Sequence, residues 1–347
     1  MKHFFTHLAL LCLFGTAALR LNAQQDPQFS QYMYNKLFMN PGYAGMKHAL
    51  CFTGIVRQQW AGFDGSPRSG VFSGDWYAEP LHGGLGINFL YDQLGFEKNL
   101  AYRVNYSFHV ENVLGGTLGI GIEGGGMTKT LGPTGSQSWV ATTNWQNDPS
   151  VPPQLKSSKM DFGAGVWYER DNMWFGISST HLSAQKFNGG TVSVNNLPHP
   201  MLYQTAHHYF ITGGYDFPMR SWILQPSFLV KTDATVTSFD LNFTALYNDK
   251  VWFGASYRFQ DAICPMIGFN WISQKNTLGG NGKDSYDGRL GSHGGKYKSQ
   301  MLRVGFAYDY TLSNLRDYNN GTFELFVNYC IPWEQRTSKH YDVRLFD

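Results

Sequence analysis

A glycine-rich run at residues 119–124, Gly-Ile-Gly-Ile-Glu-Gly, matches the GxGxxG fingerprint of dinucleotide-binding loops. The fingerprint binds a pyrophosphate only when a strand precedes it and a helix begins on it, because the helix amides must face the phosphate. Here Leu118, Ile120 and Ile122 alternate with small or polar residues, and no helical pattern follows. We therefore interpret these glycines as small residues on the inner face of a strand.

Two further kinds of chemistry are metal binding by histidines and hydrolysis by a serine with a histidine. His207 and His208 are neighbours and His199 is near them, but adjacent residues on a strand face opposite sides and cannot bind one ion as neighbours. We favour loop or interface positions over a metal site. A hydrolase embedded in a barrel would need a Ser, a His and an acid or amide on adjoining strands, and the chain has no GxSxG motif. The sequence predicts no catalytic residue, no metal site and no cofactor.

Three cysteines, Cys51, Cys264 and Cys330, follow the N-terminal region. An odd number cannot all pair within one chain, and their spacing is not that of a metal site. We favour inert thiols that are buried or face lipid. One disulfide is the alternative.

Charged residues recur on one face of many apparent strands. Charges of both signs that face a lumen either line a water-filled channel or pair with each other and close it. Both arrangements fit the sequence, because strand periodicity does not reveal the register between neighbours. The expected inward charges are Arg57, Arg103, Glu123, Glu169, Asp240, Arg258, Arg303, Asp309 and Glu324.

These charges lie in runs of about ten residues in which apolar residues alternate with small or polar ones. Because side chains on a strand alternate between its faces, each run has one apolar and one polar face. The apolar face is rich in aromatic residues, and each run is near the length that crosses a bilayer, which predicts a transmembrane β-barrel rather than a soluble sandwich. Three clear runs place on the outer face Tyr102, Val104, Tyr106, Phe108 and Val110, then Phe239, Leu241, Phe243, Ala245 and Tyr247, then Leu302, Val304, Phe306, Tyr308 and Tyr310.

The composition agrees with a barrel. Of 347 residues, 16% are aromatic, 39 are glycine and only 15% are charged. A barrel needs aromatic girdles at both membrane surfaces, and glycine where inward side chains crowd. The mean hydropathy of −0.31 is low because every second residue of a barrel faces away from lipid. The net charge of +2 comes without a basic stripe, so we expect no nucleic-acid partner.

About fourteen strands should form a closed antiparallel barrel with both termini in the periplasm. Long gaps at 128–158, 180–206 and 273–300 are expected on the extracellular side, with short turns opposite. The expected strands lie near 50–60, 69–78, 84–92, 100–110, 116–127, 159–170, 173–179, 207–217, 221–231, 237–247, 251–259, 263–272, 301–310 and 322–331. Tight turns are expected at His82-Gly83-Gly84, Asn112 to Gly116, Asp171-Asn172 and Asn248-Asp249-Lys250.

The chain divides into four parts. A positive start, a short apolar stretch and a small-residue cleavage site predict a signal peptide at 1–23. We expect an N-terminal periplasmic segment at 24–49, the transmembrane barrel at 50–331 and a C-terminal periplasmic tail at 332–347. No later run of about eighteen apolar residues exists, so a helical membrane protein is not expected, and an exported barrel points to the outer membrane.

The segment before the first strand carries the most distinctive motif. Residues 25–35 read Gln-Asp-Pro-Gln-Phe-Ser-Gln-Tyr-Met-Tyr-Asn, and residues 39–45 read Met-Asn-Pro-Gly-Tyr-Ala-Gly. This resembles the N-terminal signature of the PorP/SprF family of Bacteroidetes outer-membrane proteins, which reads QDPQFSQY…NPAYAG. Further likenesses follow in order at 57–67, 83–95 and 303–325. The resemblance covers nearly the whole chain after the signal peptide.

The resemblance implies a barrel component of the type IX secretion and gliding machinery, without catalysis. It implies partners among the periplasmic lipoprotein and peptidoglycan-binding components of that machinery, and secreted cargo such as large adhesins, with the barrel itself in outer-membrane lipid. Gly42 and Ser66 stand where the family commonly has Ala, and the gaps at 128–158 and 273–300 are long. None of these departures breaks a motif.

A barrel alone has no need for a leader dense in Asp, Gln, Asn, Pro and aromatic residues. Aromatic side chains offer large contact areas and Asn-Pro-Gly fixes a turn, so the leader could present a rigid surface to a periplasmic partner. A plug in the mouth of the barrel is the alternative for this segment. For the whole protein, a passive diffusion porin and a structural anchor without a transport role are the alternatives. The candidate partner-contact residues are Asp26, Pro27, Gln28, Phe29, Ser30, Tyr32, Asn40, Pro41, Tyr43 and Gly45.

Overall fold

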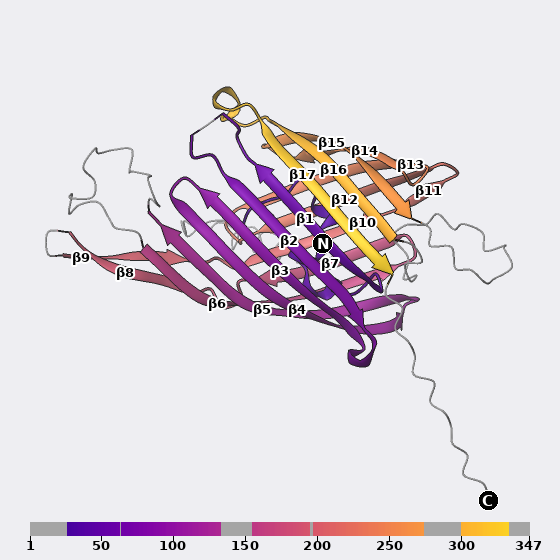
Figure 1. Cartoon of the computed structure of the whole chain (residues 1–347), viewed down its shortest axis with the longest axis horizontal. Coiled ribbons are helices and arrows are strands. Elements are labelled where there is room, and N and C mark those ends of the chain that lie inside the picture. The colour runs from indigo at the N-terminus through magenta and orange to yellow at the C-terminus, as the bar shows by residue number, and fades with distance from the viewer. Residues whose placement is uncertain (1–25, 63, 133–154, 195–196, 274–299, 333–347) are drawn as a thin grey trace, which may run out of the picture.

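The structure is a computed structural model that describes residues 26–62, 64–132, 155–194, 197–273 and 300–332. Its wall is one antiparallel sheet that closes on itself as a barrel (Figure 1). The predicted signal peptide and the end of the predicted tail lie outside the described residues. No helix in the described part of the chain is long and apolar enough to cross a bilayer.

Fourteen strands make the wall, as the alternation predicts. The sheet closes through pairing of β1 with β17 and of β10 with β12. Only Asp216 separates β10 from β11, so we count these two as one strand. The strands are β1 (Ala49–Gln58), β2 (Arg68–Ala78), β3 (Gly83–Leu94), β4 (Glu97–Val113), β5 (Gly116–Leu131), β6 (Leu155–Arg170), β7 (Met173–Thr180), β10 (His208–Tyr215) with β11 (Phe217–Met219), β12 (Trp222–Thr232), β13 (Thr237–Tyr247), β14 (Val251–Arg258), β15 (Ala262–Ser273), β16 (Gln300–Thr311) and β17 (Thr322–Pro332).

The two faces of the wall differ as the period of two requires. On β4, Tyr102 and Val104 are 51% and 57% exposed on the outside, whereas Arg103 and Asn105 are 3% and 0% exposed. A soluble protein rarely exposes so large an apolar surface, whereas a membrane barrel must. All the predicted inward charges except Arg303 are buried, and Arg303 is half-buried.

The two ends of the barrel carry different connections. We call the end with Ala49 and Pro332 the terminal end, and the opposite end the loop end. The predicted tight turns all lie at the terminal end; Leu114 and Gly115, for example, have φ values of 49° and 79° in a two-residue turn between β4 and β5.

The gap at 180–206 holds a hairpin that alternation did not predict. It consists of β8 (Lys186–Val194) and β9 (Leu197–Gln204), and it projects beyond the loop end (Figure 1). The expected position of the gap at 273–300 is wrong. This gap lies between β15 and β16 at the terminal end, whereas the other two long gaps lie at the loop end. Met301, near the start of β16, pairs with Cys330, near the end of β17, because successive strands alternate in direction.

Two of the three cysteines form a disulfide. Cys51 of β1 and Cys330 of β17 face each other in register, with their Cα atoms 4.1 Å apart. The preference for inert thiols is therefore wrong for this pair, while Cys264 is free and buried. The two residues are 279 positions apart and meet only because the last strand pairs with the first. Disulfides persist in oxidising compartments, which agrees with an exported protein.

The in–out assignment of β16 can be tested at two adjacent positions. Phe306 lies mid-strand on the lipid face, whereas Ala307 is 0% exposed and packs in the core of the lumen. Phe306→Arg should cost about 2–4 kcal/mol if the site is at the bilayer midplane, and Phe306→Leu should cost little. Ala307→Leu should cost about 1–3 kcal/mol by overpacking. Unfolding by urea in lipid vesicles measures all three, and equal costs for the two Leu variants would contradict the assignment.

Candidate functional site

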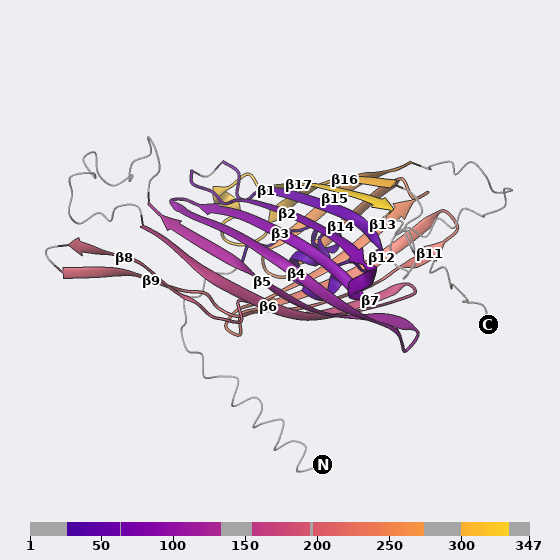
Figure 2. The same cartoon turned by 60° about the horizontal axis from the view of Figure 1, so that its bottom comes forward.

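Residues 26–48, which we call the lumen segment, lie inside the barrel (Figure 2). The segment runs from the loop end at Asp26 to the terminal end, where β1 begins. It forms three short turns, η1 (Tyr32–Tyr34), α2 (Lys36–Met39) and η2 (Pro41–Tyr43). None is long enough to be stable alone, so contacts with the wall must hold their shape.

A cluster of wall charges binds the backbone of the segment near the loop end. Glu324 accepts hydrogen bonds from the backbone N–H groups of Ser30 and Gln31, both at 2.8 Å. Arg57 forms ion pairs with Glu324 at 3.0 Å and with Asp309 at 2.6 Å. The Ser30 hydroxyl accepts from Arg57 at 2.9 Å and donates to Asp309 at 2.7 Å. The inward charges therefore pair with each other and with the segment instead of lining an open channel.

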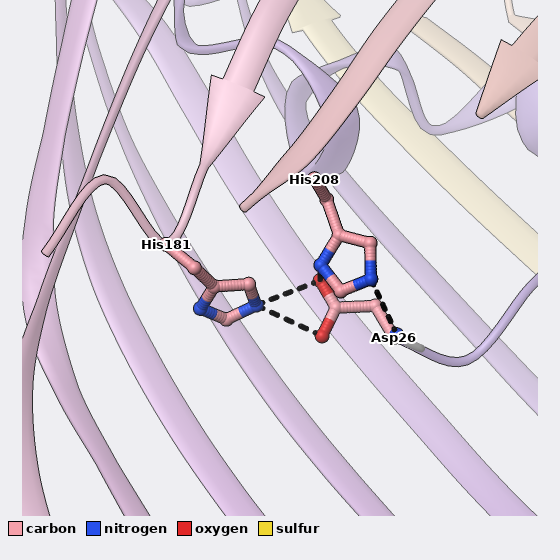
Figure 3. A group of neighbouring side chains, drawn as sticks. All are labelled: Asp26, His181 and His208. Atoms are coloured by element: carbon pink, nitrogen blue, oxygen red, sulfur yellow. Dashed lines mark hydrogen bonds and ion pairs between the residues drawn. The ribbon is translucent and has the colours of Figure 1, made fainter. Parts of the chain in front are cut away.

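A second cluster holds the start of the segment (Figure 3). The carboxylate of Asp26 lies 3.0 Å from Nε2 of His181, and Nδ1 of His181 lies 2.8 Å from Oδ2 of Asp161. The same oxygen of Asp161 lies 3.3 Å from the guanidinium of Arg103. Lys231 donates to the backbone carbonyl of Asp26.

These contacts shift the protonation equilibria of both partners. Burial by itself would raise the pKa of Asp26, but the imidazoles of His181 and His208 outweigh it and hold this pKa well below its usual value. Burial would lower the pKa of His181, yet Asp26 and Asp161 raise it to about 9. The pair is therefore charged near neutral pH.

Aromatic side chains fill the middle of the lumen. The ring of Tyr34 stacks on Phe326 at 4.8 Å and contacts Trp252 at 4.8 Å, with the guanidinium of Arg303 4.8 Å above it. Burial raises the pKa of Tyr34 to about 12, so the hydroxyl stays protonated. The buried members of this apolar core include Phe29, Tyr32, Phe38, Met39, Ile55, Phe210, Leu246 and Trp252.

Lys36 is held by aromatic rings toward the terminal end. Its Nζ lies 4.0 Å from the ring centre of Trp174 and 5.2 Å from that of Trp167. Cation–π contacts of this kind compensate in part for lost hydration. Desolvation nevertheless lowers the pKa of Lys36 to about 8, while Glu169 opposes the shift.

The Asn-Pro-Gly motif fits against a glycine-lined stretch of wall. The side chain of Asn40 accepts from the N–H of Gly42 at 2.9 Å and donates to the carbonyl of Val166 at 3.0 Å. A Cβ on Gly121 would lie 2.2 Å from the nitrogen of Gly42, and one on Gly119 would lie 2.2 Å from its oxygen. The first two glycines of the GxGxxG run are therefore lumen-facing strand residues, and they allow the backbone of the segment to approach.

Two small cavities adjoin the segment among the residues that the structure describes. A cavity beside Asp26, His181 and His208 has a volume of about 20 Å³, and another beside Phe29 and Tyr32 has the same volume. Each has room for roughly one water molecule.

The structure brings all ten predicted partner-contact residues into the lumen: Asp26, Pro27, Gln28, Phe29, Ser30, Tyr32, Asn40, Pro41, Tyr43 and Gly45. They contact the wall there, as the plug alternative expects, and not at an exposed mouth. Contact with a partner stays a prediction that requires the segment to become accessible. Sequence reasoning did not identify the wall residues that hold the segment. The alternation predicts that these side chains face inward, but which residues they pair with depends on the register between strands.

The chain is similar to known proteins in its sequence and in its fold. A family model described as "Type IX secretion system membrane protein PorP/SprF" matches residues 21–329. No curated protein matches the sequence.

Two solved barrels superpose on most of the chain. The toluene transporter TbuX of Ralstonia pickettii has a TM-score of 0.50 at 11% identity, covering 87% of this chain and 94% of that one. The CymD monoaromatic hydrocarbon channel has a TM-score of 0.50 at 10% identity, covering 88% and 94%. At such identity the likeness shows the fold alone.

The fit of the segment against the glycines can be tested with matched substitutions. Gly121→Ala should cost about 1–3 kcal/mol, because the new methyl group meets the backbone at Pro41 and Gly42. Gly54→Ala is the control, since a Cβ there has nothing within 4 Å. Urea unfolding measures stability, and limited proteolysis measures release of the segment. Equal stability and equal protection in the two variants would show that the segment does not pack against Gly121.

Proposed function

The chain belongs to the PorP/SprF family of type IX secretion system membrane proteins, and on this premise we propose that it serves the machinery as a closed outer-membrane barrel rather than as a channel. In this role it supports export or surface attachment of cargo proteins and couples to periplasmic components of the machinery. The role needs binding surfaces and no catalytic group.

The occupied lumen is the observation that carries this proposal. A diffusion porin needs a water-filled passage. Here Ser30 and Gln31 are 0% exposed and bind buried wall charges, and aromatic residues of the segment fill the middle. The porin alternative would require the segment to leave, which would break the contacts of Glu324 and Asp309 with Ser30.

Because the segment fills the lumen, the surfaces available for partner binding are the outside of the barrel and its two ends. The β8–β9 hairpin extends the loop end, and the joined strands β1 and β17 mark the terminal end. In the expected orientation the terminal end faces the periplasm, where lipoprotein and peptidoglycan-binding components would contact it. Asp26 lies at the opposite, loop end, so we retain the ten residues of the lumen segment as a proposed partner contact for a state in which the segment is released toward the periplasm.

Conductance separates a closed barrel from a porin. The wild-type protein in planar bilayers should show no steady single-channel current, because the lumen segment occupies the passage. Deletion of residues 26–48 should produce one. Folding of both proteins is checked by the heat-dependent shift on gels. Steady currents of the same size in both would overturn the closed barrel and favour the porin.

Export in cells tests the link to secretion. A strain without the protein should lose surface cargo, and the wild-type protein should restore it and co-purify periplasmic components of the machinery. Gly54→Ala should behave as wild type. Replacing Asp26, Phe29 and Tyr32 by Ala should leave a folded barrel with less co-purified partner and less export. Unchanged cargo export in the deletion strain would contradict the secretion role, and full co-purification by the triple variant would remove the segment from the partner contact.

A further inference from the structure

Three potential metal ligands converge where the lumen segment meets the wall (Figure 3). Asp26 begins the described part of the segment, His181 directly follows β7, and His208 is the first residue of β10. Because β7 and β10 are antiparallel neighbours with Thr180 opposite His208, the two histidines meet at the loop end. The three residues are far apart in sequence and come together only in the closed barrel.

The ligand atoms are close enough to share one ion. Nε2 of His181 lies 3.0 Å from Oδ1 of Asp26, and Nδ1 of His208 lies 3.9 Å from Oδ2 of the same carboxylate. One atom from each residue lies within 4.8 Å of the others. Tetrahedral Zn²⁺ with bonds of about 2.0–2.1 Å requires ligand atoms about 3.3 Å apart, a value between the two measured separations.

His208 has a ring nitrogen available for an ion. The residue is 1% exposed, and its Nδ1 makes no hydrogen bond to any residue that the structure describes. Buried polar atoms in proteins usually have a partner, and a bound ion is one way to supply it. Metal binding at Nδ1 places the proton on Nε2, so the contact from the amide of Asp26 to Nε2 must open. At 3.4 Å that contact is long for a hydrogen bond.

His181 has the surroundings of a metal ligand. Its second nitrogen, Nδ1, lies 2.8 Å from the carboxylate of Asp161, and such a carboxylate orients the ring and strengthens the bond from the other nitrogen to a metal. The ion would take the place of the proton that now lies between Nε2 and Asp26. The adjoining cavity of about 20 Å³ has room for a water molecule as fourth ligand.

The nearby positive charges have partners of their own. Lys129 pairs with Glu97, and Arg103 lies 3.6 Å from Glu123. Lys231 donates to the backbone carbonyl of Asp26, which leaves the carboxylate to the histidines.

We propose that Asp26, His181 and His208 form a binding site for one divalent transition-metal ion of the Zn²⁺ class. Two imidazole nitrogens and one carboxylate oxygen with an open position are typical ligands for such ions, whereas Ca²⁺ and Mg²⁺ prefer oxygen alone. The bound ion links the start of the lumen segment to β7 and β10 and so fastens the segment at the loop end.

Titration with Zn²⁺ tests the site in the folded, full-length mature protein. The protein is purified without a histidine tag, stripped with a chelator and titrated in a calorimeter. One Zn²⁺ should bind per chain, and the midpoint of thermal unfolding should rise with Zn²⁺. Co²⁺ in its place should give the visible absorption of a tetrahedral site.

Matched variants assign the ligands. Asp26→Asn and His208→Ala should each weaken Zn²⁺ binding at least tenfold, whereas His207→Ala, one residue away and outside the cluster, should leave it unchanged. Asp26→Asn preserves the shape of the side chain, so it keeps the test decisive if His208→Ala fails to fold. Absence of Zn²⁺ binding in the wild type, or equal binding in wild type and Asp26→Asn, overturns the proposal.

Discussion

The rest of the structure depends on two hydrogen bonds, which the backbone amides of Ser30 and Gln31 donate to the carboxylate of Glu324. Side chains alone fill a barrel of about eight strands, and one of fourteen leaves a wider lumen. The lumen segment occupies that space here. Its backbone amides and the guanidinium of Arg57 together satisfy the buried carboxylate of Glu324. A buried charge is tolerated only when it is paired and hydrogen-bonded, so the wall and the segment stabilise each other.

The sequence predicted local features well and pairings poorly. Alternation and turn residues are local, so the strand count, the tight turns and the inward direction of Arg57 could be read directly. Register is not local, and it decides that Cys51 faces Cys330 and that inward charges pair. The sequence pattern sets His207 and His208 on opposite faces of a strand, with His199 nearby, and so predicts no metal site. His181 and Asp26 reach His208 only through strand pairing and the path of the segment, which the pattern does not reveal.

The same fold serves different purposes in the proteins that superpose on this one. TbuX and CymD are described as a transporter and a channel, yet at 10–11% identity they share only the barrel with this chain. Function depends on what occupies the lumen and on what the outer surfaces bind. The glycines at 119 and 121 illustrate this, because on strand β5 they hold the Asn-Pro-Gly turn against the wall instead of cradling a phosphate.

The bond between Cys51 and Cys330 turns the wall into a covalent ring that surrounds the chain's own N-terminal tail. The molecule is therefore a lasso, with residues 51–330 as its loop and the lumen segment as the strand drawn inside it. A finished loop could admit the tail only by threading it through the mouth. The strands can instead wrap around the segment while the wall is still open, before the disulfide closes the loop.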